Sequence, residues 1–148
     1  MNIVRKLSAE EAAYLAGLID GEGTVTLTHK QKGAERHLAI TISNTEYALL
    51  EWARNVVGAG KITNKSVSKK SYLPSFTYQI HSRQALSVLE QVVPFMHGYK
   101  RDRSLLALRD YVRLTPRNGK YSAWQLEERN RFVEKLLQIH PVAGRPVH

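Results

Sequence analysis

The chain has 148 residues and a formal net charge of +9, because 22 lysines and arginines outnumber 13 acidic residues. With 43% hydrophobic residues and no cysteine, it should bury an ordinary core, and disulfides, thiolate metal sites and cysteine nucleophiles are excluded. We expect residues 1–148 to form a single domain with a loose tail after about residue 140. The positive charge favours a polyanionic partner such as nucleic acid.

Charge alone leaves open a basic protein that is merely soluble, or one that binds ribosomes or membrane surfaces. The N-terminal segment lacks the apolar core of a signal peptide, and no stretch approaches the ~18 apolar residues of a membrane span. We therefore expect a soluble, intracellular protein without a membrane partner.

The first half of the chain predicts one helix, a hairpin and a second helix. Ser8-Ala9-Glu10-Glu11 has the pattern of a capping box, which predicts a helix that begins at Ala9 and ends at Gly21 or Gly23. Thr24–Thr28 and His37–Ser43 alternate between polar and apolar residues around a polar turn, which is typical of a hairpin. Helical spacing of apolar residues then predicts a helix over Glu46–Val57, with Gly58 as its C-cap.

The second half repeats the unit of two strands and a helix and then adds helices. Strands are expected near Lys61–Val67 and Tyr72–His81, followed by a helix near Arg83–Val93 that Pro94 stops. Two more helices are expected over 101–113 and 123–139, the last after the capping box 122–125. The predicted class is α+β, with the order αββαββα, a twisted antiparallel sheet and additional C-terminal helices.

The four predicted strands have an apolar face and a polar face with few acids. The side chains expected to face the helices are Val25, Leu27, Leu38, Ile40, Ile42, Ile62, Phe76, Tyr78 and Ile80. Eight lysines and arginines stand against three glutamates between Thr24 and His81, whereas an ordinary solvated face would mix both signs. We interpret the polar face as a surface for the DNA major groove, with a merely hydrated face as the alternative.

The candidate DNA contacts comprise the polar face, its hairpin turns and the basic residues around it. The candidates are Thr24, Thr26, Thr28, Lys30, Lys32, Arg36, His37, Thr41, Lys61, Thr63, Lys65, Lys69, Lys70, Ser75, Thr77, Gln79 and His81. Within this set, Lys61, Lys65, Gln79 and Thr41 are the preferred readers of base edges. Lys69 and Lys70 are expected to hold the DNA backbone.

The first helix carries small residues at four-residue spacing. Ala9, Ala13, Gly17 and Gly21 form one ridge, along which another helix can approach closely. Glycine within a helix costs about 1 kcal/mol relative to alanine, which suggests that close backbone contact is the purpose of Gly17. The predicted helix contacts are Ala13, Gly17, Leu18 and Gly21. A core helix with a glycine C-cap is the alternative.

Two carboxylates, Asp20 and Glu22, stand at the C-terminal end of this helix, where the helix dipole disfavours negative charge. In a basic protein, carboxylates close to exposed helix-end carbonyls make an oxygen-rich site suited to Mg²⁺. This signal is weak by itself, because acidic residues near glycine turns are common.

Residues 15–23, Leu-Ala-Gly-Leu-Ile-Asp-Gly-Glu-Gly, resemble the signature of the LAGLIDADG homing endonucleases. Gly21 replaces the alanine and Glu22 the second aspartate of the signature. The expected αββαββα order is similar to that family too, so the resemblance covers about residues 8–140. It implies a site-specific double-strand DNA endonuclease that leaves short 3′ overhangs.

The resemblance also implies residue roles. Glu22 and the backbone carbonyl of Gly21 would hold the catalytic Mg²⁺, for which Mn²⁺ can substitute. Lys100, which follows a helix end that contains proline, and Asn44, at the end of the second strand, match further catalytic positions. Asn44 as a helix N-cap and Lys100 as a phosphate contact are the alternatives. Because the chain holds one copy of the motif, the resemblance implies a homodimer and a nearly palindromic double-stranded target.

Other functions fit the sequence less well. An RNA maturase on this fold would need a basic surface and no Glu22, and a DNA-binding regulator would keep the motif helix only for dimerisation. Together, Glu22 and Lys100 favour the endonuclease. A Ser/His/Asp hydrolase lacks its nucleophile motif, and the six histidines lack the paired spacing of zinc ligands.

Overall fold

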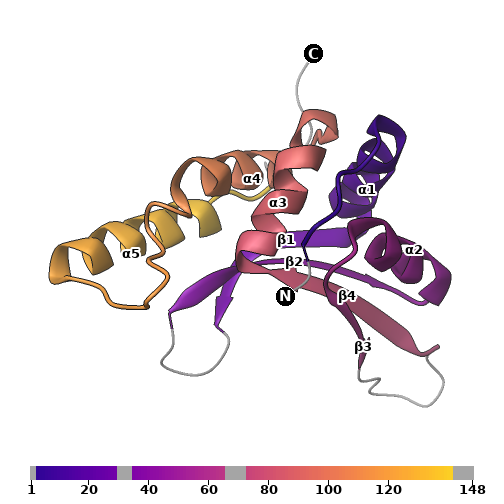
Figure 1. The fold of residues 1–148 in the computed structure, drawn as a ribbon, viewed down its shortest axis with the longest axis horizontal. Helices are drawn as coiled ribbons and strands as arrows, with labels where there is room; N and C mark the ends of the chain where they lie inside the picture. The colour runs from indigo at the N-terminus through magenta and orange to yellow at the C-terminus, as the bar shows by residue number, and fades with distance from the viewer. Residues whose placement is uncertain (1–2, 30–34, 66–72, 142–148) are drawn as a thin grey trace.

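A computed structural model describes residues 3–29, 35–65 and 73–141. Its elements follow the order αββαββα and then α4 and α5, with one 3₁₀ turn after α3 (Figure 1). The bounds are α1 Ala9–Glu22, β1 Gly23–His29, β2 Arg36–Asn44, α2 Tyr47–Val57, β3 Lys61–Lys65, β4 Ser75–His81, α3 Ser82–Val92, η1 Val93–Phe95, α4 Tyr99–Asp110 and α5 Ala123–Leu137. The predicted α+β class and the element order are confirmed.

The four strands form one antiparallel sheet in the order β1-β2-β4-β3. Side chains alternate between the two faces of a strand, and the register of the four strands places the apolar residues of each strand on the same face of the sheet. Ile42, for example, stands beside Gly23 on one side and Tyr78 on the other, and Ile62 completes that row. The apolar face follows the predicted alternation, with Ile62 and Phe76 only partly buried.

Helices α1, α2 and α3 lie on the apolar face of the sheet, and the described elements leave the opposite face open (Figure 1). The core between the layers contains Leu15, Ile19, Leu50, Leu89 and Val92, each at most 1% exposed. Burial of such side chains contributes about 1.5–3 kcal/mol each, so this layer dominates the stability of the fold. The sheet is thus covered by helices on one face only within the described structure.

Both predicted capping boxes are present. The Ser8 hydroxyl accepts from the backbone amide of Glu11, and the Glu11 carboxylate accepts from the backbone amide of Ser8. Ser122 and Gln125 repeat the arrangement at α5. Gly58 ends α2 at φ +78°, a backbone conformation that favours glycine.

The predicted helix near Arg83–Val93 is confirmed, since α3 ends at Val92 and Pro94 lies in the 3₁₀ turn that follows, where proline needs no helical hydrogen bond. Several other predicted boundaries need correction. Helix α4 begins at Tyr99 and ends at Asp110, earlier than the predicted 101–113. The structure places β3 at residues 61–65, begins β4 at residue 75 and ends α5 at residue 137. Val67, Tyr72 and the tail after residue 141 lie outside the described residues.

Helices α4 and α5 are held to the sheet by arginines that bind backbone carbonyls. Arg103 donates to the carbonyls of Val25 and Ile139, at 3.0 and 2.7 Å. Arg129, only 1% exposed, donates to the backbone of Leu114 and Arg36. Among residues 3–29, 35–65 and 73–141, no helix has both the length and the apolar character required to cross a membrane.

Candidate active site and nucleic-acid interface

The C-terminal end of α1 meets the N-terminal end of α4, which brings Lys100 to the acidic end of the motif. The Lys100 ammonium donates to the carbonyls of Ile19 and Asp20, at 3.1 and 3.0 Å. Burial lowers the pKa of Lys100, whereas the nearby Asp20 and Glu22 carboxylates act in the opposite direction. The structure therefore places together the two predicted residues Glu22 and Lys100, which are 78 positions apart in the sequence.

Glu22 is exposed and is the last residue of α1. Directly after it, a side chain at Gly23 would come within 2.8 Å of the Ile19 backbone and 3.1 Å of the Thr41 carbonyl. Only glycine permits this close passage from helix to strand. The passage holds Glu22 and the exposed Gly21 at the corner between α1 and the sheet.

The Asp20 carboxylate is bonded to the segment that leads into α4 and is not grouped with the Glu22 carboxylate as the sequence had suggested. It accepts hydrogen bonds from the backbone amides of His97 and Gly98, at 2.8 and 3.3 Å. Both oxygens of Asp20 are thus directed at the start of α4.

In a single chain, the corner between α1 and the sheet offers few oxygen ligands for Mg²⁺. One chain supplies the Glu22 carboxylate and the Gly21 carbonyl, and the described part of the chain contains no group of three or more His, Asp or Glu side chains able to hold a metal ion. Magnesium is commonly held by one or two protein carboxylates together with substrate phosphates. The residues present therefore fit a magnesium site only in part, and further oxygen ligands would have to come from outside the described residues, such as substrate phosphates.

Asn44 is the last residue of β2. Ile42, two residues earlier on β2, pairs with Gly23 at the start of β1. The Asn44 side-chain oxygen accepts from the backbone amide of Glu46 at 2.8 Å. This turn leads the chain into α2, although the N-cap itself is Glu46. The contact accounts for Asn44 structurally, so its catalytic role stays a prediction.

The open sheet face carries polar side chains in rows that cross the strands. Thr24, Thr41, Gln79 and Lys61 form one row across all four strands. Parallel rows contain Thr28 and His37, then Thr26, Ala39 and His81, then Ser43, Thr77 and Thr63, and finally Ser75 and Lys65. Ala39 is only 1% exposed, and the other residues whose burial is described are half-buried or exposed. Apart from Ala39, the described side chains of this face offer hydroxyl, amide, imidazole and ammonium groups.

Arg36 departs from this array. Strand alternation places it on the side of Leu38 and Ile40, and its Nη1 donates to the Leu27 carbonyl at 2.9 Å. We therefore remove Arg36 from the candidate DNA contacts. Lys30, Lys32, Lys69 and Lys70 lie outside the described residues, as does the side chain of Lys65.

Sequence reasoning missed Ser43, whose hydroxyl lies 2.8 Å from that of Thr77 on the polar face. The alternation of β2 could have identified it, because Ser43 has the parity of Thr41. It also missed the contact of Asp20 with residues 97 and 98, for which no local signal exists.

The small-residue ridge of α1 faces away from the core. Ala9, Ala13, Gly17 and Gly21 are exposed, whereas the buried residues of this helix are Ala12, Leu15, Ala16 and Ile19. Within the described structure, a Cβ built at Gly17 or at Gly21 meets no neighbouring atom within 4 Å. Nothing in the described chain therefore requires these glycines. Leu18, the remaining predicted helix contact, packs partly against the core.

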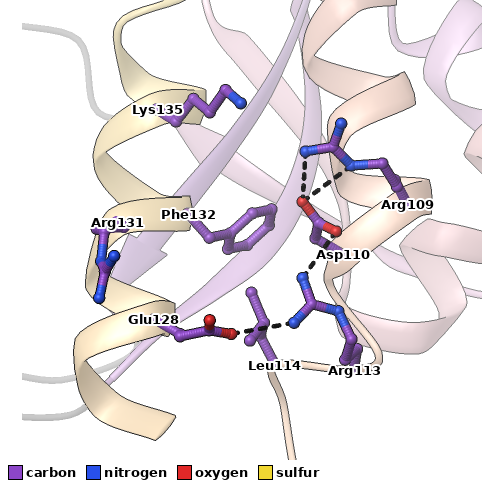
Figure 2. Close-up of a pocket in the computed structure, with 8 residues that line it drawn as sticks. All are labelled: Arg109, Asp110, Arg113, Leu114, Glu128, Arg131, Phe132 and Lys135. Carbon is purple, nitrogen blue, oxygen red and sulfur yellow. Dashed lines mark hydrogen bonds and ion pairs between the residues drawn. The ribbon is translucent and has the colours of Figure 1, made fainter. Parts of the chain in front are cut away.

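A separate cleft lies between α4 and α5, and four of the charged residues that line it bind one another (Figure 2). Asp110 accepts from Arg109 and Arg113, at 2.9 and 3.0 Å, and Arg113 also reaches Glu128 at 3.1 Å. The hydrogen bond from Arg109 is the largest of the contacts that lower the pKa of Asp110. These ion pairs join α4 to α5, and we assign the cleft a structural role.

A half-covered antiparallel sheet with a polar open face, and a helix end that carries Glu22 beside Lys100, define a protein of the nucleic-acid-processing class. The family model described as LAGLIDADG endonuclease matches residues 15–125. Since this match covers most of the sequence, the chain belongs to the LAGLIDADG endonuclease family. The predicted family and fold are confirmed.

Solved structures with the same fold include homing endonucleases complexed with DNA. The chain is 16% identical to I-CvuI with a TM-score of 0.72, covering 94% of this chain and 87% of that one. It is 17% identical to the archaeal intron-encoded I-Vdi141I with a TM-score of 0.70, covering 94% and 89%. The meganuclease I-SmaMI is 18% identical with a TM-score of 0.58, and the match covers 82% of this chain but 43% of that one. At these identities the likeness shows the shared fold.

Proposed function

We propose that this LAGLIDADG endonuclease cleaves double-stranded DNA at a specific, nearly palindromic site, acting as a homodimer with Mg²⁺. The observation that carries the proposal is the position of Glu22 and Lys100 at one end of an exposed helix ridge. A partner helix on that ridge would bring a second Glu22 and a second Lys100 to the same place.

The homodimer is supported by the composition of α1 on both of its faces. The buried face of α1 packs on the sheet, whereas the ridge from Ala9 to Gly21 is exposed in the single chain, and its small residues would let the backbone of a second helix approach closely. The match to less than half of I-SmaMI fits a fold unit that works in pairs. Two copies related by a two-fold axis would recognise two inverted half-sites.

Double-stranded DNA as the partner is supported by the open polar face and the net charge of +9. The structures of I-CvuI and I-Vdi141I are complexes with DNA. A twisted strand surface enters a major groove, where hydroxyl, amide and ammonium groups can bond to base edges. Basic residues around the sheet would neutralise phosphates.

The chemistry assigns a separate task to each residue. Glu22 and the Gly21 carbonyl would hold Mg²⁺, which when bound supplies charge neutralisation and an activated water. Lys100, fixed beside Glu22, would stabilise the negative charge that grows on the phosphate as water adds to phosphorus and the 3′ oxygen leaves. Asn44 would order the attacking water through its side-chain amide.

Selection of cleaved molecules from a randomised duplex library should recover one nearly palindromic sequence with Mg²⁺. Calcium should support binding of the same sequence without cleavage. A DNA-binding regulator would enrich bound duplexes but cleave none with either ion, and a maturase would retain structured RNA in preference to every duplex. Either result would contradict the endonuclease proposal.

Gln79→Ala should relax sequence preference at one base pair in each half-site by about 1–3 kcal/mol. The reason is that Gln79 lies in the row that crosses all four strands of the polar face. Cleavage profiling on single-substituted targets measures the change. Lys135→Ala, on α5, serves as the control for loss of a polar side chain away from this face. An equal loss on all targets would be inconsistent with base recognition by Gln79.

A further inference from the structure

The C-terminal end of α1 and the N-terminal end of α4 are hydrogen-bonded to each other through two side chains. The Asp20 carboxylate accepts from the His97 and Gly98 amides, and the Lys100 ammonium donates to the Ile19 and Asp20 carbonyls. Asp20 belongs to α1 and caps α4, whereas Lys100 belongs to α4 and caps α1. Each contact depends on the position of the other helix.

Neither helix end receives such a contact from its own cap or last-turn residues. The N-cap of α4 is Gly98, which makes no side-chain cap hydrogen bond, and α1 has no basic residue in its last turn. A carboxylate at a helix N-terminus and an ammonium at a helix C-terminus are both favoured by the helix dipole. Each helix end is therefore hydrogen-bonded by a charged side chain that the other helix provides, and the exposed Asp102 in the first turn of α4 makes no cap hydrogen bond at Gly98.

We propose that Asp20 is a positioning residue for the reaction, which fixes Lys100 beside Glu22 and does not bind metal. This inference rests on the proposed endonuclease function and deepens it. Asp20 binds the two residues that immediately precede Tyr99 and Lys100, so it determines where the first turn of α4 begins. Lys100, in that turn, then reaches the carbonyls at the end of α1.

This role differs in its consequences from two alternatives. A metal ligand at residue 20 would lose its function in Asp20→Asn almost as severely as in Asp20→Ala. A positioning residue would keep much of its function in Asp20→Asn, because the amide oxygen still accepts from a backbone N–H. A cap that affects only stability would leave the cleavage rate of the folded protein unchanged.

The experiment is a double-mutant cycle on Asp20→Ala and Lys100→Met, read out as the single-turnover cleavage rate on the selected target. We expect Asp20→Ala to slow cleavage at least tenfold with DNA affinity within about threefold, since a displaced Lys100 acts mainly in the transition state. The double variant should cleave no more than twofold slower than Lys100→Met alone. If the double variant instead loses the product of the two single rate reductions, the proposal is overturned, because Asp20 would then act independently of Lys100.

Two further variants complete the test. Asp102→Ala removes an exposed carboxylate from the first turn of α4 itself and should change the rate by less than twofold. Asp20→Asn should recover at least half of the rate lost in Asp20→Ala, and a rate equal to that of Asp20→Ala would overturn the proposal. If Asp20→Ala does not fold, Asp20→Ser, which lacks both carboxylate oxygens, replaces it in the cycle and in the comparison with Asp20→Asn, and the same criteria apply.

Hydrogen exchange separates failure of this inference from failure of the proposed function. The amides of His97 and Gly98 should be protected in the wild-type protein and exchange at least tenfold faster in Asp20→Ala, whether or not any DNA is cleaved. Unchanged protection would overturn the contact itself. A wild-type protein that cleaves no duplex but shows the expected exchange would contradict the endonuclease proposal and the catalytic consequence of the contact.

Discussion

Glu22→Gln should reduce the single-turnover rate of DNA cleavage by at least about a thousandfold while target affinity stays within about tenfold. A bound metal contributes several kcal/mol of charge stabilisation in phosphoryl transfer, and each 1.36 kcal/mol is a factor of ten in rate. Glutamine keeps the size and polarity of the side chain but removes the negative charge that binds Mg²⁺. Because Glu22 is exposed at the end of α1, the change should leave the fold intact.

The measurement pairs quenched-flow cleavage with equilibrium binding in Ca²⁺. Glu10→Gln is a matched control, since it makes the same change at an exposed position in the first turn of α1, at the opposite end of that helix. Unchanged cleavage by Glu22→Gln would remove Glu22 from the site, and equal losses of affinity and rate would make it a binding residue only.

Gly17→Leu should convert the dimer to a folded monomer and abolish cleavage. Gly17 lies at the centre of the exposed ridge, and a leucine there would force two crossed helices apart and move both Glu22 side chains out of register. Within one chain the new side chain meets no neighbour at its Cβ. Gly17→Ala should therefore stabilise the isolated chain by about 1 kcal/mol through helix propensity, even as it weakens association.

Sedimentation with and without target DNA measures the association state, and thermal unfolding of the monomer measures stability. Glu134→Leu places a leucine on an exposed position of α5 and should leave the dimer unchanged. Gly23→Ala is the contrasting case, because its Cβ would come within 2.9 Å of the Ile19 carbonyl and should destabilise each chain. A monomeric wild type that cuts both strands, or a dimeric Gly17→Leu variant, would contradict the homodimer proposal.

The substitutions at Glu22 and Gly17 test residues that resemble their neighbours in the motif but differ from them in the structure. Gly17 and Gly23 both stand in the motif, yet only Gly23 has an intramolecular reason to be glycine. Asp20 and Glu22 are both carboxylates at a helix C-terminus, yet Asp20 is bonded to α4 whereas Glu22 is exposed.

The sequence by itself determined the element order, the two faces of the sheet and the family. Capping boxes, glycine caps and the two-residue period of the strands are local signals, and each depends on residues only a few positions apart. The nine residues of the motif were sufficient to predict the family, because their spacing and composition are specific.

Only the tertiary structure decided the partners of Asp20, the approach of Lys100 to the end of α1, the side of β2 on which Arg36 acts and the exposure of the Gly17 ridge. These facts depend on contacts between elements far apart in the chain, and no local pattern encodes which helix end meets which. The acidic end of α1 is unfavourable when considered alone, since the helix dipole opposes it. The structure resolves this conflict because α4 supplies the cation that the last turn of α1 lacks, and the Asp20 carboxylate of α1 in turn accepts from the backbone amides that precede α4.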